Sequence, residues 1–380
     1  MVSGSEEYSA SRPAMKCHPL GHSRWGDMFQ LNETDDGICR SPLESIQDKS
    51  EGAVTLGSTP IIWIDWARNV RTHTLTDRLG VERVEITVQR VGVMRYFKCA
   101  LYTIAALRKY RPQVVIATNP SFVLVSLLLM LRRWFGYALV SDAHYGGVRL
   151  MHPNGILQKL LDFYNAKADL VVVTNRGHAD YIAGLGGRPY VCPDPLPKLP
   201  DAQETMSSLP AKAVFLVCSF DNDEPYKAVF AAFGRLKDKG YELFVSGNYR
   251  KASIEPAQFP WVRFLGFVPY EVYCNYLRSC ALIVDLTVLE DCLVCGAYEA
   301  LAAGKPLVLS RTRALVDYFG TAAVLTDNTT ASIAECVERA YDERELLEVR
   351  AAAWAKANEL YMSERIQGLK TALDTVADSR

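Results

Sequence analysis

Short apolar runs alternate with segments of helical periodicity over most of this chain, starting near residue 59. In the helical segments, such as Met94 to Tyr110, apolar residues recur at helical spacing, whereas the runs between them are continuous and bounded by turn residues. Six such runs occupy the first half of the pattern and are expected to be strands: Ile61–Asp65, Val84–Val88, Val114–Ala117, Tyr137–Val140, Leu170–Val173 and Pro189–Cys192. Strands that alternate with helices predict a parallel sheet covered by helices.

A second set of strands with the same rhythm follows a proline-rich break. Four prolines fall between Pro193 and Pro200, and this density predicts a linker. The six apolar runs beyond the linker are Val214–Val217, Glu242–Ser246, Val262–Leu265, Ala281–Leu286, Leu307–Leu309 and Ala323–Leu325. The sequence therefore predicts an α/β fold of two doubly wound, Rossmann-like parallel-sheet domains that face a central cleft.

Composition sets the expected domain boundaries. Residues 1–57 are polar, rich in Ser, Glu, Asp and Gly, and lack periodicity, so we expect a disordered N-terminal extension. An N-terminal Rossmann-like domain at 58–195, a linker at 196–210 and a C-terminal Rossmann-like domain at 211–345 follow. Residues 346–380 are rich in Ala, Glu and Arg and are expected to be helical.

Charge and cysteine content narrow the classes of function. The 380 residues carry a formal net charge of −1, so no basic field indicates nucleic-acid binding. The ten cysteines are scattered, mostly within apolar runs, which is typical of reduced thiols in a cytoplasmic protein. Residues 1–57 contain no apolar signal segment, and the longest apolar run, Phe122–Leu131, is too short to span a bilayer. Cys292 and Cys295 form one CxxC pair, but no second pair of ligands accompanies it as a zinc site would require.

The strongest candidate site follows the run Ala281–Leu286, where a polar loop leads into a helix that Gly304 ends. Amides at the helix start, around Leu293, Val294 and Cys295, lack helical partners, and the helix dipole adds positive charge there. Glu299 lies one turn further on and leans back toward this end, and Gly296 leaves room beside it. Such an arrangement suits a nucleoside diphosphate whose ribose hydroxyls donate to the carboxylate. A capped helix with a solvated glutamate explains the spacing equally well.

This segment resembles the signature of retaining glycosyltransferases of family 4, which have the two-domain fold called GT-B. The match runs from Glu299 through Ala300-Leu301-Ala302-Ala303-Gly304-Lys305 to Pro306, and Asp291 stands eight positions earlier, where the family has its first acidic residue. Cys292-Leu293-Val294 replaces the family's usual Gly-Phe-Gly. The resemblance implies a UDP- or GDP-sugar donor that Glu299 and Asp291 hold, and a glycan or lipid-linked acceptor. It also implies a last helix that crosses back to the N-terminal domain. We expect no obligate cofactor or metal.

Other strand ends supply further candidates. By resemblance, His144 and the neighbouring Asp142 lie against the donor sugar, and Phe267 lies against the nucleotide base. Arg68 and Arg71 follow the first strand and suit an acceptor or a phosphate, although a solvated first helical turn is as good an explanation. The loop from Cys218 to Lys227 departs from the family, because it is acidic where many members carry an Arg and a Lys. Candidate cations for the donor phosphates are Lys227, Arg250 and Lys251, with Arg311 and Arg313 as further ones.

The function expected from these residues is a metal-independent glycosyltransferase that retains the anomeric configuration. Two alternatives stay open: a weak or inactive nucleotide-sugar-binding or scaffold protein, which the altered cation pair favours, and a sugar-nucleotide epimerase of the same architecture. Arg132, Arg133, Trp134 and Phe135 form a basic and aromatic cluster. This cluster predicts weak, salt-sensitive peripheral contact at the inner face of a membrane.

Overall fold

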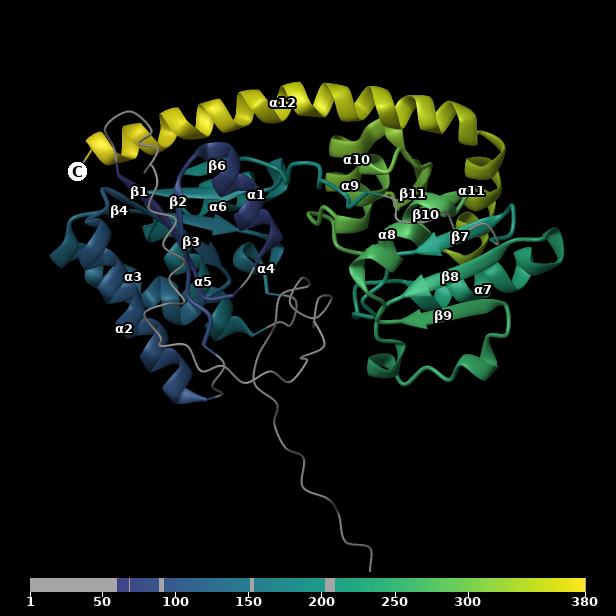
Figure 1. The fold of residues 1–380 in the computed structure, drawn as a ribbon, viewed down its shortest axis with the longest axis horizontal. Coiled ribbons are helices and arrows are strands. Elements are labelled where there is room, and N and C mark those ends of the chain that lie inside the picture. Colours follow the sequence, from purple (N-terminus) through teal and green to yellow (C-terminus); the bar gives the residue numbers. More distant parts are fainter. Residues whose placement is uncertain (1–59, 68, 89–91, 151–153, 202–208, 380) are drawn as a thin grey trace, which may run out of the picture.

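The computed structural model describes residues 60–67, 69–88, 92–150, 154–201 and 209–379. The predicted extension, residues 1–57, and Arg68 lie outside these residues. Two α/β units stand side by side and are bridged along one edge by a long C-terminal helix (Figure 1). Each unit is a parallel sheet of six strands, counted over the described residues, with helices packed on it.

The N-terminal sheet has the strand order β2-β1-β3-β4-β5-β6, and all its pairs are parallel. Its strands are β1 (Ile61–Asp65), β2 (Glu82–Glu85), β3 (Val114–Asn119), β4 (Ala138–Ala143), β5 (Leu170–Val173) and β6 (Pro189–Val191). Its helices are α1 (Val70–Leu79), α2 (Val93–Tyr110), α3 (Phe122–Phe135), α4 (Tyr145–Val148), α5 (Gly155–Lys167) and α6 (Arg176–Gly184). Every residue of β1 is buried because helices cover both faces of the sheet.

The C-terminal sheet has the order β12-β11-β10-β7-β8-β9, also parallel throughout. Its strands are β7 (Ala213–Leu216), β8 (Glu242–Ser246), β9 (Val262–Gly266), β10 (Leu282–Asp285), β11 (Leu307–Ser310) and β12 (Val324–Thr326). Its helices are α7 (Tyr226–Leu236), α8 (Tyr270–Ser279), α9 (Cys295–Ala302), α10 (Arg313–Phe319) and α11 (Thr330–Asp342), with short 3-10 helices at Lys237–Lys239, Tyr249–Ala252, Pro256–Gln258 and Gly320–Ala322. Two apolar clusters, one on each face, form its core.

A single helix, α12 (Arg344–Asp378), ties the two units together. Near its start, Leu347 and Ala351 pack into the clusters of the C-terminal unit. Further along, a run of apolar side chains spaced at helical intervals packs into the N-terminal core: Met362, Ile366, Leu369, Leu373 and Val376. At 1.5 Å per residue the helix is roughly 50 Å long, which is enough to lie across both sheets. In the described part of the chain, no helix has the length and apolar character needed to cross a bilayer.

The predicted fold class is confirmed: two doubly wound parallel sheets alternate with helices in the order that the periodicity indicated. The largest shift is in β2, which was expected at Val84–Val88 and is found at Glu82–Glu85. The partner strand sets this register, because β1 pairs from Ile62 opposite Glu82 and ends with Asp65 opposite Glu85. Ile86 is buried although it follows the strand, so its apolar character misled the prediction.

Candidate functional site

Each sheet has a topological switch point, a place where two neighbouring strands are followed by connections that lead to opposite edges of the sheet. In the N-terminal sheet the switch point lies between β1 and β3, and in the C-terminal sheet it lies between β7 and β10. Ligands of open parallel sheets bind beside such points, outside the carboxyl ends of the strands. The candidate residues are therefore those on the loops after β7 and β10, the start of α9, and the facing loops of the N-terminal unit.

The first turn of α9 packs closely against the ends of β7 and β10. The helix begins after Val294, and no side chain of the described residues forms a capping hydrogen bond there. A Cβ atom on Gly296 would lie 2.7 Å from Oδ2 of Asp285 and 2.8 Å from Cβ of Val217. Because both neighbours stand at the ends of central strands, only glycine lets the first turn of α9 sit directly on the switch point.

Glu299 lies on the inner side of α9 and is only 2% exposed. The hydroxyl of Tyr273 on α8 donates a hydrogen bond to Oε2 of Glu299. Burial raises the pKa of Glu299 to about 7, and the hydrogen bond from Tyr273 only partly opposes this rise. The sequence placed Glu299 one turn inside the helix, as found, but did not reveal that the carboxylate would be buried against a tyrosine.

Asp291, the first acidic position, is engaged in an ion pair. Nε of Arg313 donates to Oδ1 of Asp291 at 3.0 Å, and Nη2 of Arg313 contacts the same oxygen. The main-chain oxygen of Asp291 accepts a hydrogen bond of 2.8 Å from Nδ2 of Asn175 in the N-terminal unit. The β10–α9 loop is therefore fixed both to α10 and to the opposite domain.

The acidic loop after β7 is organised around its own carboxylates. Glu224 is buried and accepts hydrogen bonds from the amides of Ser219 and Asp221, at 3.0 and 2.9 Å. Nζ of Lys251 pairs with the carboxylate of Asp221. Lys227 is exposed on the first turn of α7. The amides and one of the three candidate cations are thus taken up within the loop region, and Lys227 is the cation nearest in sequence to it.

Two further predicted donor residues lie on the surface beyond β8 and β9. Arg250 is exposed, and its guanidinium lies 5.3 Å from the ring centre of Tyr249. Phe267 directly follows β9 and is 53% exposed. An aromatic ring that stays this accessible at a strand end is available to stack on a planar ligand.

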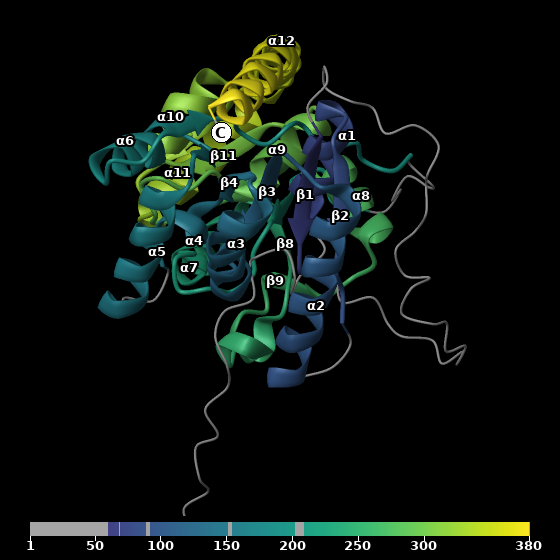
Figure 2. The same cartoon turned by 90° about the vertical axis from the view of Figure 1, so that its left-hand side faces the viewer.

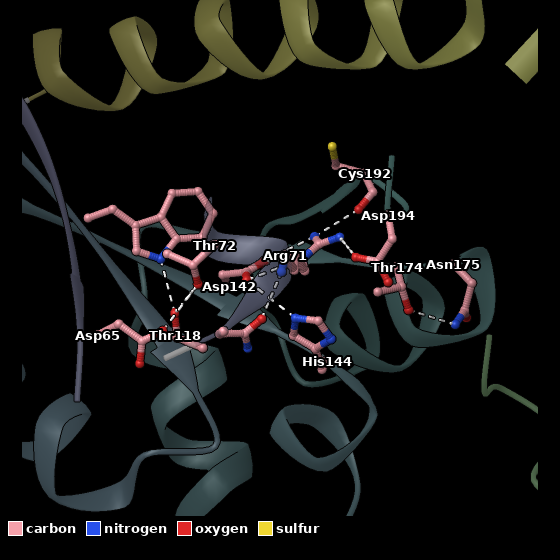
Figure 3. A network of polar contacts seen from close by, with 12 residues as sticks. Asp65, Arg71, Thr72, Thr118, Asp142, His144, Thr174, Asn175, Cys192 and Asp194 are labelled. Carbon is pink, nitrogen blue, oxygen red and sulfur yellow. Dashed lines mark hydrogen bonds and ion pairs between the residues drawn. The ribbon is translucent and has the colours of Figure 1, made fainter. Parts of the chain in front are cut away.

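Arg71, expected on the acceptor side, is instead buried in a network of polar contacts within the N-terminal unit (Figure 3). Its Nε and Nη2 atoms donate to Oδ1 of Asp142 at 3.1 and 3.0 Å. Nη1 donates to Asp194 at 2.6 Å, and Nη2 also donates to the main-chain oxygen of Cys192 at 2.8 Å. The guanidinium of Arg71 therefore links Asp142, at the end of β4, to Cys192 and Asp194, in the segment after β6.

Asp142 is fully buried at the end of β4 and keeps its charge. Burial alone would raise its pKa, but the charge of Arg71 and the hydrogen bonds of His144 and Arg71 lower the pKa to about 2. His144 directly precedes the short helix α4 and, in the described part of the chain, forms no side-chain capping hydrogen bond. Its Nε2 lies 3.6 Å from Oδ2 of Asp142, and its side chain is partly exposed. The structure therefore brings the two predicted catalytic residues together, with a buried anion behind a more accessible imidazole (Figure 3).

His178 was not expected to act in the site; it lies on α6, which contacts α10 of the C-terminal unit. Its side chain is fully buried, its ring centre lies 5.6 Å from that of Tyr145, and its Nδ1 lies 3.3 Å from Nδ2 of Asn175. Burial lowers the pKa of His178 to about 4, so the ring is neutral near pH 7. The available signal was Asn175 three positions earlier, whose side chain accepts from the amide of His178 and starts α6.

Asp65, at the N-terminal switch point, was also missed. It is buried at the end of β1, where it accepts from the amide of Ala67 at 3.0 Å and from the hydroxyl of Thr72 at 3.2 Å. Burial raises the pKa of Asp65 to about 6. Among the described residues, no three His, Cys, Asp or Glu side chains gather as a metal site would require.

Comparison with known proteins identifies the fold. No protein-family profile matches the chain, and no curated protein matches its sequence. Solved structures do match. HepE of Anabaena in complex with UDP and glucose has a TM-score of 0.61 and 13% identity, over 84% of this chain and 99% of that one. Sucrose-phosphate synthase of Thermosynechococcus elongatus has a TM-score of 0.60 and 16% identity, over 84% of this chain and 97% of that one. A glycosyltransferase of Rickettsia africae has a TM-score of 0.63 and 10% identity, over 83% of this chain and 98% of that one. The chain therefore has the two-domain GT-B fold of these glycosyltransferases.

Proposed function

We propose that this protein is a glycosyltransferase that moves a sugar from a nucleotide-sugar donor, a UDP- or GDP-sugar, to a glycan or lipid-linked acceptor with retention of configuration. One observation carries the proposal: the uncapped start of α9 sits on the switch point of the C-terminal sheet, with the carboxylate of Glu299 one turn inside it. HepE, which has the same fold, was crystallised with UDP and with UDP-glucose, and this supports a nucleotide-sugar donor.

The amide end of α9 is the part of the site that suits the donor diphosphate. Amides from Leu293 to Gly296 and the positive end of the helix dipole favour an anion there. Lys227, Arg250 and Lys251 are the cations that can approach it, Lys251 only by leaving Asp221. Glu299 accepts the ribose hydroxyls, and Phe267 offers its exposed ring to the base. In this assignment Asp291 acts indirectly, because Arg313 occupies its carboxylate and Asn175 holds its main chain.

His144 and Asp142 form the sugar side of the proposed site. The buried carboxylate of Asp142 lies 3.6 Å from Nε2 of His144, and we place the donor sugar against this imidazole. We assign no covalent nucleophile. Fixed dipoles and charges stabilise the leaving diphosphate, and the acceptor hydroxyl attacks the anomeric carbon from the same face. The reaction needs no metal ion in this scheme, and activity in the presence of EDTA tests that point.

The first experiment is calorimetric titration with a panel of UDP- and GDP-sugars at pH 8, where Glu299 is mostly ionised. Glu299→Gln keeps the volume but removes the charge, and loss of a charged hydrogen bond should weaken donor binding roughly tenfold or more. Glu271→Ala on the exposed start of α8 is the matched control and should bind the donor normally. Equal affinity in Glu299→Gln and the wild type would remove Glu299 from the ribose role.

The second experiment separates transfer from mere binding. Release of nucleotide from the bound donor is followed with and without candidate acceptors, and the anomeric configuration of the product is read by NMR. A protein that binds the donor but releases no nucleotide under any condition would be a binding protein, and an epimerised donor would indicate an epimerase. Failure of every UDP- and GDP-sugar to bind would overturn the proposed function itself.

A further inference from the structure

Three helices of the N-terminal unit, α2, α3 and α5, lie side by side on one face of its sheet (Figure 2). This layer lies on the face of the sheet opposite to α12 (Figure 1). We call the solvent-exposed side of this layer the outer face. Large hydrophobic side chains are exposed on all three helices: Val93, Met94, Tyr96, Phe97 and Leu101 on α2, Val123, Met130 and Trp134 on α3, and Ile156, Leu160 and Phe163 on α5.

The spacing of these residues shows that packing on the sheet does not explain them. On α3 the inward residues Leu124, Val125 and Leu128 are fully buried and already supply the contact with the core. Val123, Met130 and Trp134 follow helical spacing on the opposite side, and Trp134 is 75% exposed. The other two helices repeat the pattern: Phe97 on α2 is 58% exposed, and Ile156 on α5 is 82% exposed. Exposed large apolar side chains on three neighbouring helices are typical of an interaction surface.

The charges on the same helices are almost all positive. The three helices contain one acidic residue, Asp162, whose carboxylate accepts hydrogen bonds from Gln158 at 2.8 Å and Tyr181 at 3.0 Å. Against it stand eight basic residues: Arg95, Lys98, Arg108, Lys109, Arg132, Arg133, Lys159 and Lys167. These helices thus carry a net charge of +7 in a chain whose net charge is −1.

The helix α12 provides an internal comparison. It also exposes large apolar side chains, among them Val349 and Leu360, but its 35 residues include five basic and six acidic ones. Exposed apolar residues alone are therefore found elsewhere on this molecule. Unlike α12, the helices of the outer face combine exposed apolar side chains with a charge that is almost purely positive.

We propose that the outer face docks on the surface of an anionic lipid bilayer. Apolar and aromatic side chains at helical spacing enter the boundary between headgroups and acyl chains, while flanking lysines and arginines contact anionic headgroups. The cluster Arg132–Phe135, expected from sequence to make weak contact, is one edge of this larger surface. The proposal does not depend on the proposed glycosyltransferase activity, and its test requires no substrate.

The test is sedimentation of the full chain with vesicles of phosphatidylcholine alone, or of phosphatidylcholine and phosphatidylglycerol in equal parts. Most of the protein should sediment with the anionic vesicles at about 50 mM salt, and much less at about 500 mM salt, because salt screens the attraction. Little should sediment with the neutral vesicles. Wild-type protein that stays in the supernatant with anionic vesicles at low salt would overturn the proposal.

Two triple variants, each with one substitution per helix, separate the contributions. Lys98→Gln/Arg133→Gln/Lys159→Gln should weaken partitioning about a hundredfold, at roughly fivefold for each charge near an anionic surface. Phe97→Ser/Trp134→Ser/Ile156→Ser should abolish sedimentation at low salt, since charge alone gives no insertion. Five of these six residues are exposed and Lys98 is partly exposed, and none forms a side-chain hydrogen bond in the described structure, so the melting temperature should stay near that of the wild type.

Matched controls come from α12. Arg350→Gln/Lys356→Gln and Val349→Ser/Leu360→Ser alter exposed residues of the same kinds and should sediment like the wild type. A loss of binding in these controls as large as in the outer-face variants would contradict the proposal. So would a wild type that is dimeric in sedimentation velocity without lipid and becomes monomeric in Phe97→Ser/Trp134→Ser/Ile156→Ser, because the outer face would then join two copies of this chain.

Discussion

Replacing Glu299 by glutamine should change how the free energy of unfolding depends on pH. The Glu299 carboxyl is 2% exposed, and its pKa is raised from 4.5 to about 7 because burial disfavours the charged form. Between pH 4.5 and 7 the folded protein therefore binds this proton more tightly than the unfolded chain does. Stability contributed by the protonated group is fully present below pH 4.5 and is lost as the pH rises through 7.

The size of the effect follows from the shift itself. A pKa change of one unit corresponds to 1.36 kcal/mol, so the rise from 4.5 to about 7 corresponds to about 3 kcal/mol of stability lost across the window. Glutamine keeps the shape and an acceptor for the hydroxyl of Tyr273 but has no proton to lose. The variant should thus gain about 3 kcal/mol relative to the wild type between pH 4 and pH 8.

The assay is urea unfolding of wild type and Glu299→Gln at several pH values from 4 to 8, compared as the difference between the two proteins at each pH. Tyr273→Phe is an informative companion, because the hydrogen bond of Tyr273 lowers the pKa of Glu299. Its removal should move the loss of stability to higher pH. A difference between wild type and Glu299→Gln that is constant from pH 4 to pH 8 would show that Glu299 does not titrate in this range.

Three further predictions concern other buried positions. Arg71→Met should lower the free energy of unfolding in urea by about 3–5 kcal/mol because it removes the ion-pair partner of the buried Asp142 and of the half-buried Asp194, whereas Arg78→Met, which breaks an exposed ion pair, should lower it by under about 1 kcal/mol. Gly296→Ala should lower the free energy of unfolding by about 1–3 kcal/mol and weaken donor binding in a calorimetric titration. In the control Gly184→Ala the new methyl group has open space around it, so this variant should be as stable as the wild type. His178→Gln should remove a loss of stability that the wild type shows on acidification from pH 6.5 to 4, measured by the same urea series.

Periodicity was enough to predict both sheets because parallel strands are buried on both faces. A central strand is then a nearly continuous apolar run, and Ile61–Asp65 and Leu170–Val173 match the structure to the residue. The edge strand β2, Glu-Arg-Val-Glu, is not such a run, and its bounds were predicted less well. The predicted helix end at Gly304 was also recovered, because this glycine takes a positive φ of 67° just past the end of α9. Local chemistry dictates such features, so a single sequence contains them.

The partners of the polar side chains could not be predicted, because they are set by contacts between residues far apart in sequence. Nothing near Arg71 in the chain indicates that Asp142 and Asp194, 71 and 123 positions away, take up its guanidinium. Likewise, the loop after β7 is acidic in sequence, but only the structure shows that Glu224 accepts its amides. Motif spacing placed Glu299 on the right helix, and burial against Tyr273 decided its chemistry.

The buried groups of the site also act against one another as the pH changes. Glu299 and Asp65 have raised pKa values, so their contributions to stability fall as the pH rises, Asp65 between 3.8 and about 6. His178 has a lowered pKa, so its contribution grows over 4 to 6.5. These windows overlap between pH 4.5 and 6, where two of the three contributions fall with rising pH and one grows. The stability contributed by these groups should therefore fall more steeply with pH in His178→Gln than in the wild type. It should fall less steeply in Glu299→Gln, where Asp65 and His178 oppose each other. A Glu299→Gln curve that falls as steeply as the His178→Gln curve would contradict the opposite shifts that burial imposes on an acid and a base.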